Sequence, residues 1–269
     1  MSRKFVIGDI HGAHIPLQQC LNRCNFDYND DLLITIGDVC DGWPYVYECV
    51  EELLKIKNRI DIRGNHDEWF YNFIKTGYHP DGWKQGGKGT KLSYLRNKGI
   101  TETGLQDHES VLLPGDIPES HRVFFAKQHL YYKDDQNNLF VHGGINRSLT
   151  LKQQQHRCDA MDFYWDRDLF LASIDAHICK TKLLFAEEFS HIFIGHTQTN
   201  HYTCAVMDTS YISMKNTGYF CPPLFVDRVI NLDTGAGSIG RLTIMDIDSL
   251  EFFQSDIVTG IYGIYKPRG

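Results

Sequence analysis

The stretch Lys4-Phe5-Val6-Ile7-Gly8-Asp9-Ile10-His11-Gly12 joins a short apolar run to a Gly-Asp-x-His-Gly motif. The run predicts a buried β-strand, so the motif lies where that strand ends and the chain turns. The same order recurs twice, with Leu32 to Ile36 before Gly37-Asp38-Val39-Cys40-Asp41, and Arg59 to Ile62 before Gly64-Asn65-His66-Asp67. Ligands bind at the carboxyl ends of strands in α/β folds, so these side chains can converge on one point.

Helices are predicted between the three strands. Pro16 suits the first turn of a helix, and apolar residues from Leu17 to Cys24 follow at helical spacing. Pro44 opens a second helix, whose apolar face runs from Val46 to Leu54. Strand, helix, strand, helix and strand in this order argue for right-handed parallel crossovers, and therefore for an α/β fold.

Residues 68–130 follow a different pattern. Aromatic residues from Trp69 to Phe73 predict a helix that begins just after the third motif, and the glycine-rich stretch from Gly82 to Gly89 predicts a loop. Two further segments, Leu92 to Asn97 and Glu119 to Lys127, have helical patterns. We expect one domain spanning residues 1–269, with a helical insertion at about 68–130, because this part lacks a linker and a core of its own.

Strand patterns return in the second half of the chain. A hairpin is expected around Asp134-Asp135-Gln136-Asn137, and its second strand ends at His142-Gly143-Gly144. After a mainly helical stretch at 151–190, a strand ends at Gly195-His196-Thr197. Two last strands, joined by a turn that begins at Asp233, are expected to close the sheet; they are Arg228 to Leu232 and Arg241 to Ile247.

Composition narrows the class of protein. The formal net charge is −7, from 27 basic and 34 acidic residues, which weighs against a binder of nucleic acid or anionic membranes. The eight cysteines include no CxxC pair, so zinc-finger spacing is absent. The first apolar run is too short for a signal peptide, and no stretch is apolar enough to span a membrane. We expect a cytoplasmic protein with reduced thiols.

Six polar residues at the predicted strand ends offer oxygen and imidazole donors without a thiolate. They are Asp9, His11, Asp38, Asn65, His142 and His196. Such a set suits manganese, iron or zinc, and it is large enough for two ions that share a bridging carboxylate, for which Asp38 is the natural candidate. Two ions ~3.5–4 Å apart can orient a hydroxide and hold both oxygens of an in-line phosphoryl displacement. A single strand-end histidine is more often structural, but five such motifs in order indicate a shared site.

The five motifs resemble those of the calcineurin-like metallophosphoesterases, specifically the phosphoprotein phosphatase branch. That branch has GDxHG, GDxxDRG, GNH followed by an acid, HGG and GH, and the likeness covers nearly the whole chain. Trp83 with Gly86-Gly87, and Asp233-Thr234-Gly235, are similar to bacterial members that include protein phosphatases and symmetrical dinucleoside tetraphosphate hydrolases. The resemblance implies a four-layer sandwich of two mixed β-sheets flanked by helices, the metallo-dependent phosphatase fold.

Carried over by position, the resemblance also implies roles for individual residues. Asp9, His11 and Asp38 would hold one metal ion, with manganese the first choice. The second metal ion would be held by Asp38 together with Asn65, His142 and His196. His66 would be the general acid for the leaving oxygen, with Asp41 as the carboxylate that orients it.

One departure from the family pattern concerns the phosphate-binding arginine of GDxxDRG, whose position here is Gly42. Arg167, in Trp165-Asp166-Arg167, fits the place of a second family arginine and is the first candidate to bind phosphate; the alternative is a surface arginine. Arg63 is the second candidate, with an ion pair inside the protein as its alternative. A competing view is that Gly42 and Trp43 widen the groove for a larger or aromatic substrate.

The main functional expectation is a two-metal hydrolase of phosphate monoesters that acts on small phosphate esters or on a phosphorylated protein. A dinucleoside polyphosphate hydrolase is the alternative enzyme, because it would share the metal site and differ only in the substrate groove. A metal-binding scaffold that lost turnover together with the arginine at position 42 is the non-enzymatic alternative.

Overall fold

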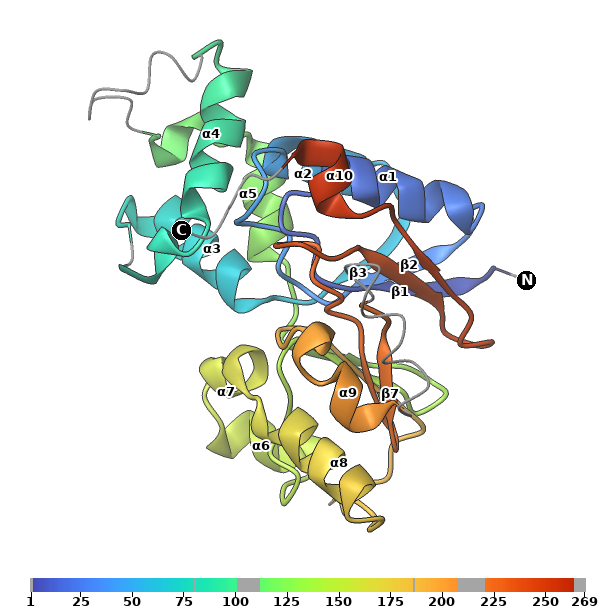
Figure 1. Cartoon of the computed structure of the whole chain (residues 1–269). Helices are drawn as coiled ribbons and strands as arrows, with labels where there is room; N and C mark the ends of the chain where they lie inside the picture. The colour runs from blue at the N-terminus through green and yellow to red at the C-terminus, as the bar shows by residue number, and fades with distance from the viewer. Residues whose placement is uncertain (1, 80, 101–111, 186, 208–220, 264–269) are drawn as a thin grey trace.

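The computed structural model of the chain describes residues 2–79, 81–100, 112–185, 187–207 and 221–263. Two mixed β-sheets of five strands each pack face to face, and helices cover their outer faces (Figure 1). The helices α1, α2 and α10 lie over the first sheet, and α8 and α9 lie over the second. The sequence-based expectation of a four-layer α/β sandwich is therefore confirmed.

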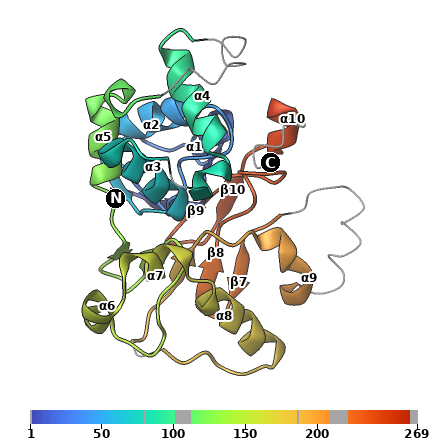
Figure 2. The same ribbon diagram turned by 90° about the vertical axis from the view of Figure 1, so that its left-hand side faces the viewer.

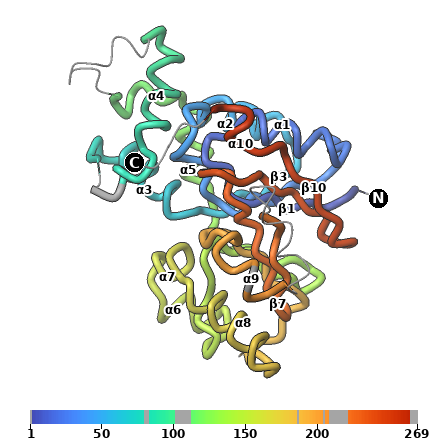
Figure 3. The backbone as a smooth tube through the Cα atoms, viewed as in Figure 1, coloured from blue at the N-terminus to red at the C-terminus, as the bar shows by residue number. Residues whose placement is uncertain are grey.

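The first sheet has the strand order β10-β9-β1-β2-β3. Its parallel part consists of β1 (Lys4–Ile7), β2 (Leu32–Thr35) and β3 (Asn58–Asp61), with α1 (His14–Arg23) and α2 (Val46–Leu54) as the connections. The predicted parallel crossovers are confirmed. Two late strands complete this sheet: β9 (Thr243–Asp246) pairs antiparallel with β1, and β10 (Phe252–Gln254) pairs antiparallel with β9. The late strand β10 therefore lies close to the early strand β1 in space (Figure 3).

The second sheet has the order β4-β5-β6-β8-β7. The predicted hairpin is present as β4 (Tyr131–Lys133) and β5 (Leu139–Val141), and β6 (Ile192–Ile194) follows β5 in parallel. The last two strands are β7 (Leu224–Val226) and β8 (Val229–Asn231). β7 lies outside the strands that the sequence predicted.

The two last predicted strands do not close one sheet. β8, within Arg228 to Leu232, belongs to the second sheet, whereas β9, within Arg241 to Ile247, belongs to the first. The segment that begins at Asp233 therefore carries the chain from one sheet to the other, and it is not a hairpin turn. Alternating apolar residues fit either pairing, so the pattern alone could not decide which sheet each strand joins.

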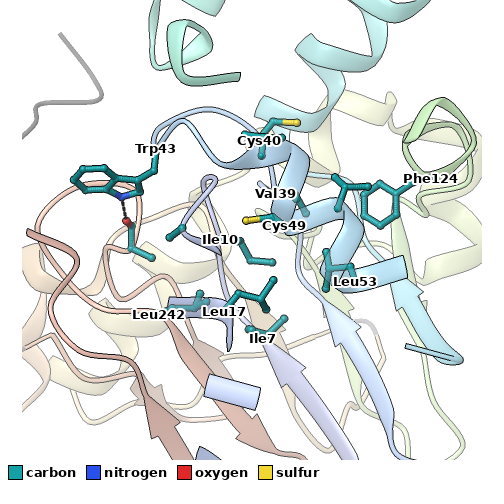
Figure 4. Close-up of a cluster of buried hydrophobic side chains, with 14 of the residues drawn as sticks. Ile7, Ile10, Leu17, Val39, Cys40, Trp43, Cys49, Leu53, Phe124 and Leu242 are labelled. Atoms are coloured by element: carbon teal, nitrogen blue, oxygen red, sulfur yellow. Dashed lines mark hydrogen bonds between the residues drawn. The ribbon is translucent and has the colours of Figure 1, made fainter. Parts of the chain in front are cut away.

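Alternate residues of each strand point to opposite faces of the sheet and so belong to different buried clusters. Val6, Ile34, Phe140 and Phe193 belong to a buried cluster between the two sheets, where the rings of Phe140 and Phe193 stack with centroids 4.9 Å apart. The strand residues between them, such as Phe5, Ile7 and Leu33, point to the other face of the first sheet. They belong to a second buried cluster under the helices, part of which is drawn in Figure 4. This period of two buries both faces of each sheet, which fixes the register of the strands and the position of their ends.

The described residues between 65 and 126 are mainly helical, and α3, α4 and α5 lie together beside the first sheet (Figure 2). These elements are α3 (Asn65–Thr76), η1 (Asp81–Lys84), α4 (Gly87–Asn97), η3 (Pro114–Asp116) and α5 (Glu119–Ala126). The expected loop from Gly82 to Gly89 is wrong in part, because α4 begins at Gly87. α3 begins inside the third motif, at Asn65, and not after it. The assignment of the chain to one domain with an insertion stays a prediction.

The mainly helical stretch after residue 150 is confirmed over the residues that the structure describes. It contains α6 (Leu151–Arg157), α7 (Ala160–Trp165) and α8 (Asp168–Ile178). Short helices follow as η4 (Thr199–His201), α9 (Thr203–Val206) and α10 (Val258–Tyr262). Within the described ranges, every helix is too short or too polar to cross a bilayer.

Candidate metal centre

The carboxylate of Asp38 lies at the centre of the site. Its Oδ2 atom is 3.6 Å from Nε2 of His11, 3.4 Å from Nε2 of His142 and 4.0 Å from Nε2 of His66. Asp38 follows β2, which runs between β1 and β3, so the middle strand of the parallel part carries the central ligand. Parallel strands end at one edge of a sheet, and this is how residues far apart in sequence meet.

Backbone carbonyls fix the orientation of two imidazoles. Nδ1 of His11 lies 2.7 Å from the carbonyl oxygen of Asp41, and Nδ1 of His142 lies 2.8 Å from that of Ile36. A carbonyl can only accept, so both Nδ1 atoms carry a proton, and Nε2 is in each case the ring atom that faces Asp38. Histidine ligands of metal ions in proteins are usually held by such a second hydrogen bond.

Asn65 joins the last two predicted ligands to the site. Its Oδ1 atom is 3.1 Å from Nε2 of His142 and 2.9 Å from Nδ1 of His196. The backbone N–H of His196 donates to Oδ2 of Asp9 at 3.0 Å, and that same oxygen lies 3.9 Å from Nε2 of His11. All six residues that the sequence singled out as metal ligands are therefore gathered in one place.

The donor set fits divalent cations. Oδ1 of Asp9 and Nε2 of His196 are buried and have no hydrogen-bond partner within the described part of the chain. Buried polar atoms of this kind are rare unless an ion or water satisfies them. Oxygen and imidazole donors without thiolate suit manganese, iron or zinc. Asp9, Asp38 and His142 each present a ligand atom within 4.8 Å of the others, as do His11, Asp38 and His66.

The backbone at the site is strained. His11, Asp38, Asp41 and His196 all have positive φ angles, between 50° and 65°. Residues other than glycine adopt this left-handed region at a cost of order 1–3 kcal/mol each, and such residues cluster at functional sites. Four of the eight residues assigned to metal binding or to the general acid pair thus have a positive φ angle.

The titration behaviour of the carboxylates also fits bound cations. Burial and the nearby carboxylate of Asp233 raise the pKa of Asp9 well above its usual range. Burial acts in the same direction on Asp38, but the surrounding imidazoles outweigh it and hold the pKa of Asp38 well below its usual range. Asp38 in turn outweighs the burial of His142 and raises its pKa to about 10. A divalent cation would keep both carboxylates ionised and would displace the proton from His142.

His66 and Asp41 form a buried pair next to this cluster. Nδ1 of His66 lies 2.9 Å from Oδ2 of Asp41, and the backbone N–H of His66 donates to Oδ1 of Asp38 at 3.0 Å. The ring of Trp69 contacts His66 edge-on, with centroids 4.8 Å apart. With Nδ1 held by a carboxylate, Nε2 is the ring atom that faces the centre and can exchange a proton there.

The two candidate phosphate-binding arginines lie in different settings. Arg167 is exposed at the start of α8, and its Nη1 donates to Oγ1 of Thr197 at 2.9 Å. Thr197 directly follows His196 in the chain, so this hydrogen bond holds Arg167 close to the metal ligands. Burial, His142 and the charge of Arg167 together lower the pKa of His196 to about 2.

Arg63, by contrast, is occupied inside the protein. Its guanidinium pairs with Glu68 at 2.9 Å, donates to the carbonyl oxygen of Phe125 at 2.6 Å and lies 4.4 Å from the ring centroid of Tyr71. These contacts favour the alternative of an ion pair inside the protein, and we leave Arg63 out of the functional proposal.

Asp67 has a supporting role that the sequence did not reveal. One of its oxygens accepts from the backbone N–H groups of Val39 and Cys40 at 2.9 and 3.1 Å. The other accepts from the N–H of Gly64 at 3.2 Å and from Nε2 of Gln128 at 2.9 Å. Asp67 thus ties the second motif to the third. Gln128 has no motif around it, so nothing in the sequence could have identified it.

Trp43 does not open the groove at the missing arginine. The side chain is 1% exposed, and its indole Nε1 donates to the carbonyl oxygen of Ala236 at 2.7 Å (Figure 4). It packs with Tyr262 of α10, the two ring centroids lying 4.8 Å apart. Trp43 is therefore a core residue that presents almost no surface to a substrate.

Comparison with known proteins agrees with the geometry. A sequence model of the calcineurin-like phosphoesterase family matches residues 3–200, which include all six candidate ligands. The chain belongs to this family. Membership makes the protein a metal-dependent phosphoester hydrolase and favours an enzyme over the scaffold alternative.

Relatives of known name fall into two substrate classes. The chain is 39% identical to serine/threonine-protein phosphatase 1 of Salmonella typhimurium over 64 residues, which are 24% of this chain and 29% of that protein. It is 23% identical over 255 residues to the asymmetrical bis(5'-nucleosyl)-tetraphosphatase of Bacillus cereus, covering 88% of this chain and 87% of that one. A crystal structure of a proposed diadenosine tetraphosphatase superposes with a TM-score of 0.59 at 14% identity, covering 94% of this chain and 92% of that one. The last likeness concerns the fold alone.

Proposed function

We propose that the protein hydrolyses phosphate monoesters with two divalent metal ions and with His66 as the general acid. The observation that carries this proposal is the position of the Asp38 carboxylate, whose Oδ2 lies within 4.0 Å of Nε2 of three imidazoles. One of these, His66, is held at its other nitrogen by Asp41. A site of this kind can bind cations on one side and deliver a proton from the other.

Two groups of residues would hold the ions. Asp9, His11 and Asp38 would form the first, and Asp38 would also belong to the second, together with Asn65, His142 and His196. When bound, the ions supply Lewis-acid activation of water and neutralise charge on the phosphoryl oxygens, with manganese as the first choice.

Residues of the chain would do the rest of the chemistry. His66 protonates the leaving oxygen from Nε2, while Asp41 stabilises the charged imidazole through Nδ1–H. Arg167 binds phosphoryl oxygens from the exposed side, and Thr197 holds its guanidinium by accepting a hydrogen bond at 2.9 Å. With glycine at position 42, Arg167 is then the main cationic side chain on the phosphate.

Hydrolysis of dinucleoside polyphosphates is the second candidate. It is favoured by the similarity over 88% of this chain to a bis(5'-nucleosyl)-tetraphosphatase. The relative with this coverage is described as asymmetrical, whereas the sequence motifs alone suggested the symmetrical type. The two types cleave different bonds, so the products of diadenosine tetraphosphate separate them: AMP with ATP, or two ADP.

The experiment is a substrate panel on metal-free protein to which manganese is added back. We expect hydrolysis of 4-nitrophenyl phosphate and of a phosphopeptide to depend on the metal. Preference for diadenosine tetraphosphate over both would replace the first candidate by the second. Hydrolysis at the same rate in metal-free protein would contradict both.

A further inference from the structure

The two carboxylate oxygens of Asp41 have different partners. Oδ2 faces Nδ1 of His66 at 2.9 Å. Oδ1 accepts from the indole Nε1 of Trp83 at 2.8 Å and from Oγ1 of Thr90 at 2.5 Å. Asp41 and Thr90 are fully buried and Trp83 is 3% exposed, so water does not compete for these bonds. The carboxylate is therefore held by donors on both of its oxygens.

Thr90 makes a second contact with the same residue. Its Oγ1 accepts from the backbone N–H of Asp41 at 3.0 Å while its hydroxyl proton goes to Oδ1. One hydroxyl thus ties the main chain and the side chain of Asp41 together. This arrangement fixes the χ1 angle of Asp41, and with Trp83 it fixes the plane of the carboxylate.

Three glycines allow the segment that carries these donors to approach Asp41. A Cβ at Gly86 would lie 2.9 Å from the backbone nitrogen of Gly42, and a Cβ at Gly89 would lie 2.0 Å from its carbonyl oxygen. A Cβ at Gly87 would lie 2.3 Å from a ring carbon of Trp83. The backbone of Gly42 also donates to the carbonyl oxygen of Gly86 at 3.1 Å. The glycine-rich sequence that predicted a loop is therefore explained by close packing on Asp41 and Gly42.

We propose that Trp83 and Thr90, the donor pair of Asp41, are positioning residues for the general acid. The proposal rests on the proposed function, in which His66 protonates the leaving oxygen. The donor pair sets the position of Oδ2, Oδ2 sets the direction of the His66 ring, and the ring directs Nε2 at the site. A displacement of about 1 Å in such a chain can cost about 100-fold in rate.

Three variants test the donor pair. Trp83→Phe removes the indole N–H and keeps an aromatic ring, and Thr90→Val removes the hydroxyl and keeps the branched shape. Thr90→Ser keeps the hydroxyl and is the conservative variant expected to restore activity. Trp43→Phe is the matched control, because it also removes a buried indole hydrogen bond of 2.7 Å, but one made to the carbonyl oxygen of Ala236.

The readout is the dependence of kcat/KM on the leaving group. Trp83→Phe and Thr90→Val should lower kcat/KM about 10- to 100-fold for an alkyl phosphate and much less for 4-nitrophenyl phosphate, since an acidic phenol needs little protonation. Neither variant should reduce activity further in a His66→Asn background. Trp43→Phe should leave the ratio between the two substrates unchanged. Equal losses on both substrates, or additive losses with His66→Asn, would overturn the proposal.

A second readout does not depend on activity. In metal-free protein labelled with ¹⁵N, the indole N–H resonance of Trp83 is assigned by its loss in Trp83→Phe. Asp41→Asn should shift this resonance and leave that of Trp43 in place; an unshifted Trp83 resonance would overturn the proposal. A wild-type enzyme inactive on every ester would count against the proposed function instead, and the resonance would still decide the donor pair.

Discussion

Nδ1 of His66 and Oδ2 of Asp41 lie 2.9 Å apart in a part of the protein from which solvent is nearly excluded. The carboxylate holds the imidazole at Nδ1, so the ring presents Nε2 to the site as the atom that can pass a proton to a leaving group. The pair lies beside the metal ligands and is not itself needed to complete their set. Its contribution can therefore be separated from metal binding by experiment.

Replacing His66 by asparagine should reduce activity most on substrates with poor leaving groups. General acid catalysis contributes about 10²–10⁴-fold, and an alkyl phosphate should lose most of that factor. 4-Nitrophenyl phosphate should be affected less because its phenolate leaves without protonation. The measurement is kcat/KM for a series of phosphate esters of graded leaving-group pKa. A uniform loss across the series would make His66 a structural or metal-orienting residue.

Asp38→Asn should cost more activity than any other single change among the predicted ligands. Its Oδ2 is shared between His11 at 3.6 Å and His142 at 3.4 Å, so its charge serves both halves of the site. His11→Ala removes a donor from one half only and is the matched comparison. The measurement is manganese content together with kcat/KM at saturating metal. If Asp38→Asn loses no more than His11→Ala, Asp38 is not the bridge.

Manganese should stabilise the protein against heat. The site buries Asp9 and Asp38 together, and a cation relieves the repulsion between them. A ligand at 100 times its Kd stabilises the folded state by about 2.7 kcal/mol, which corresponds to roughly 5–10 °C in Tm for a chain of this size. Thermal unfolding with and without manganese measures this. Asp38→Asn should show a much smaller shift, and an equal shift would place the bound metal elsewhere.

The candidate site could be predicted from the sequence because each ligand follows a strand with a clear apolar run. Asp9, Asp38 and Asn65 lie two, three and four residues after the ends of β1, β2 and β3. Parallel strands end at one edge of the sheet, so the convergence of these residues follows from the topology. The contacts that support the ligands could not be predicted in the same way. The hydrogen bond from Gln128 to Asp67 joins residues 61 positions apart and has no sequence signal.

Glycine and histidine positions show a second limit of sequence reasoning. Gly87 and Gly89 predicted a loop, because glycine is unfavourable in helices. Yet α4 contains both, since Gly87 packs against the ring of Trp83 and Gly89 packs against the backbone of residues 42 and 43. His121 belongs to no sequence motif, but it is fully buried, and its ring nitrogens lie 2.8 Å from the hydroxyl oxygen of Tyr94 and 2.7 Å from a carboxylate oxygen of Glu51. In both cases contacts with distant parts of the chain determine the structure, and the hydrophobic periodicity of the sequence does not show such contacts.

Gly42→Ala should destabilise the fold, and Gly42→Arg should not create a new phosphate-binding group. Gly42 has φ of +123°, and a Cβ there would lie 2.8 Å from the carbonyl oxygen of His11. The conformational strain alone is worth about 1–3 kcal/mol. Gly99→Ala is the control, because Gly99 also has positive φ but open space around it. Thermal melts should show the larger loss for Gly42→Ala; equal losses would mean that the contact with His11 is relieved without cost.

Arg167→Ala should lower kcat/KM for small phosphate monoesters by about one to two powers of ten. Hydrogen bonds to a charged group are worth roughly 1.5–3 kcal/mol each, and ~1.4 kcal/mol corresponds to a factor of ten. Arg167→Lys should recover only part of the loss, because an ammonium group cannot bind two oxygens at once as a guanidinium does. Thr197→Val, which removes the hydroxyl that accepts from Nη1 at 2.9 Å, should cause a smaller loss that disappears in an Arg167→Ala background.

Arg63→Ala is the informative comparison for Arg167→Ala. Because Arg63 has Glu68 and Phe125 as its partners, its loss should lower Tm more than it lowers kcat/KM. If Arg167→Ala leaves kcat/KM unchanged while Arg63→Ala lowers it, the phosphate is bound from the other side of the site, and the ion pair of Arg63 with Glu68 must open when substrate binds.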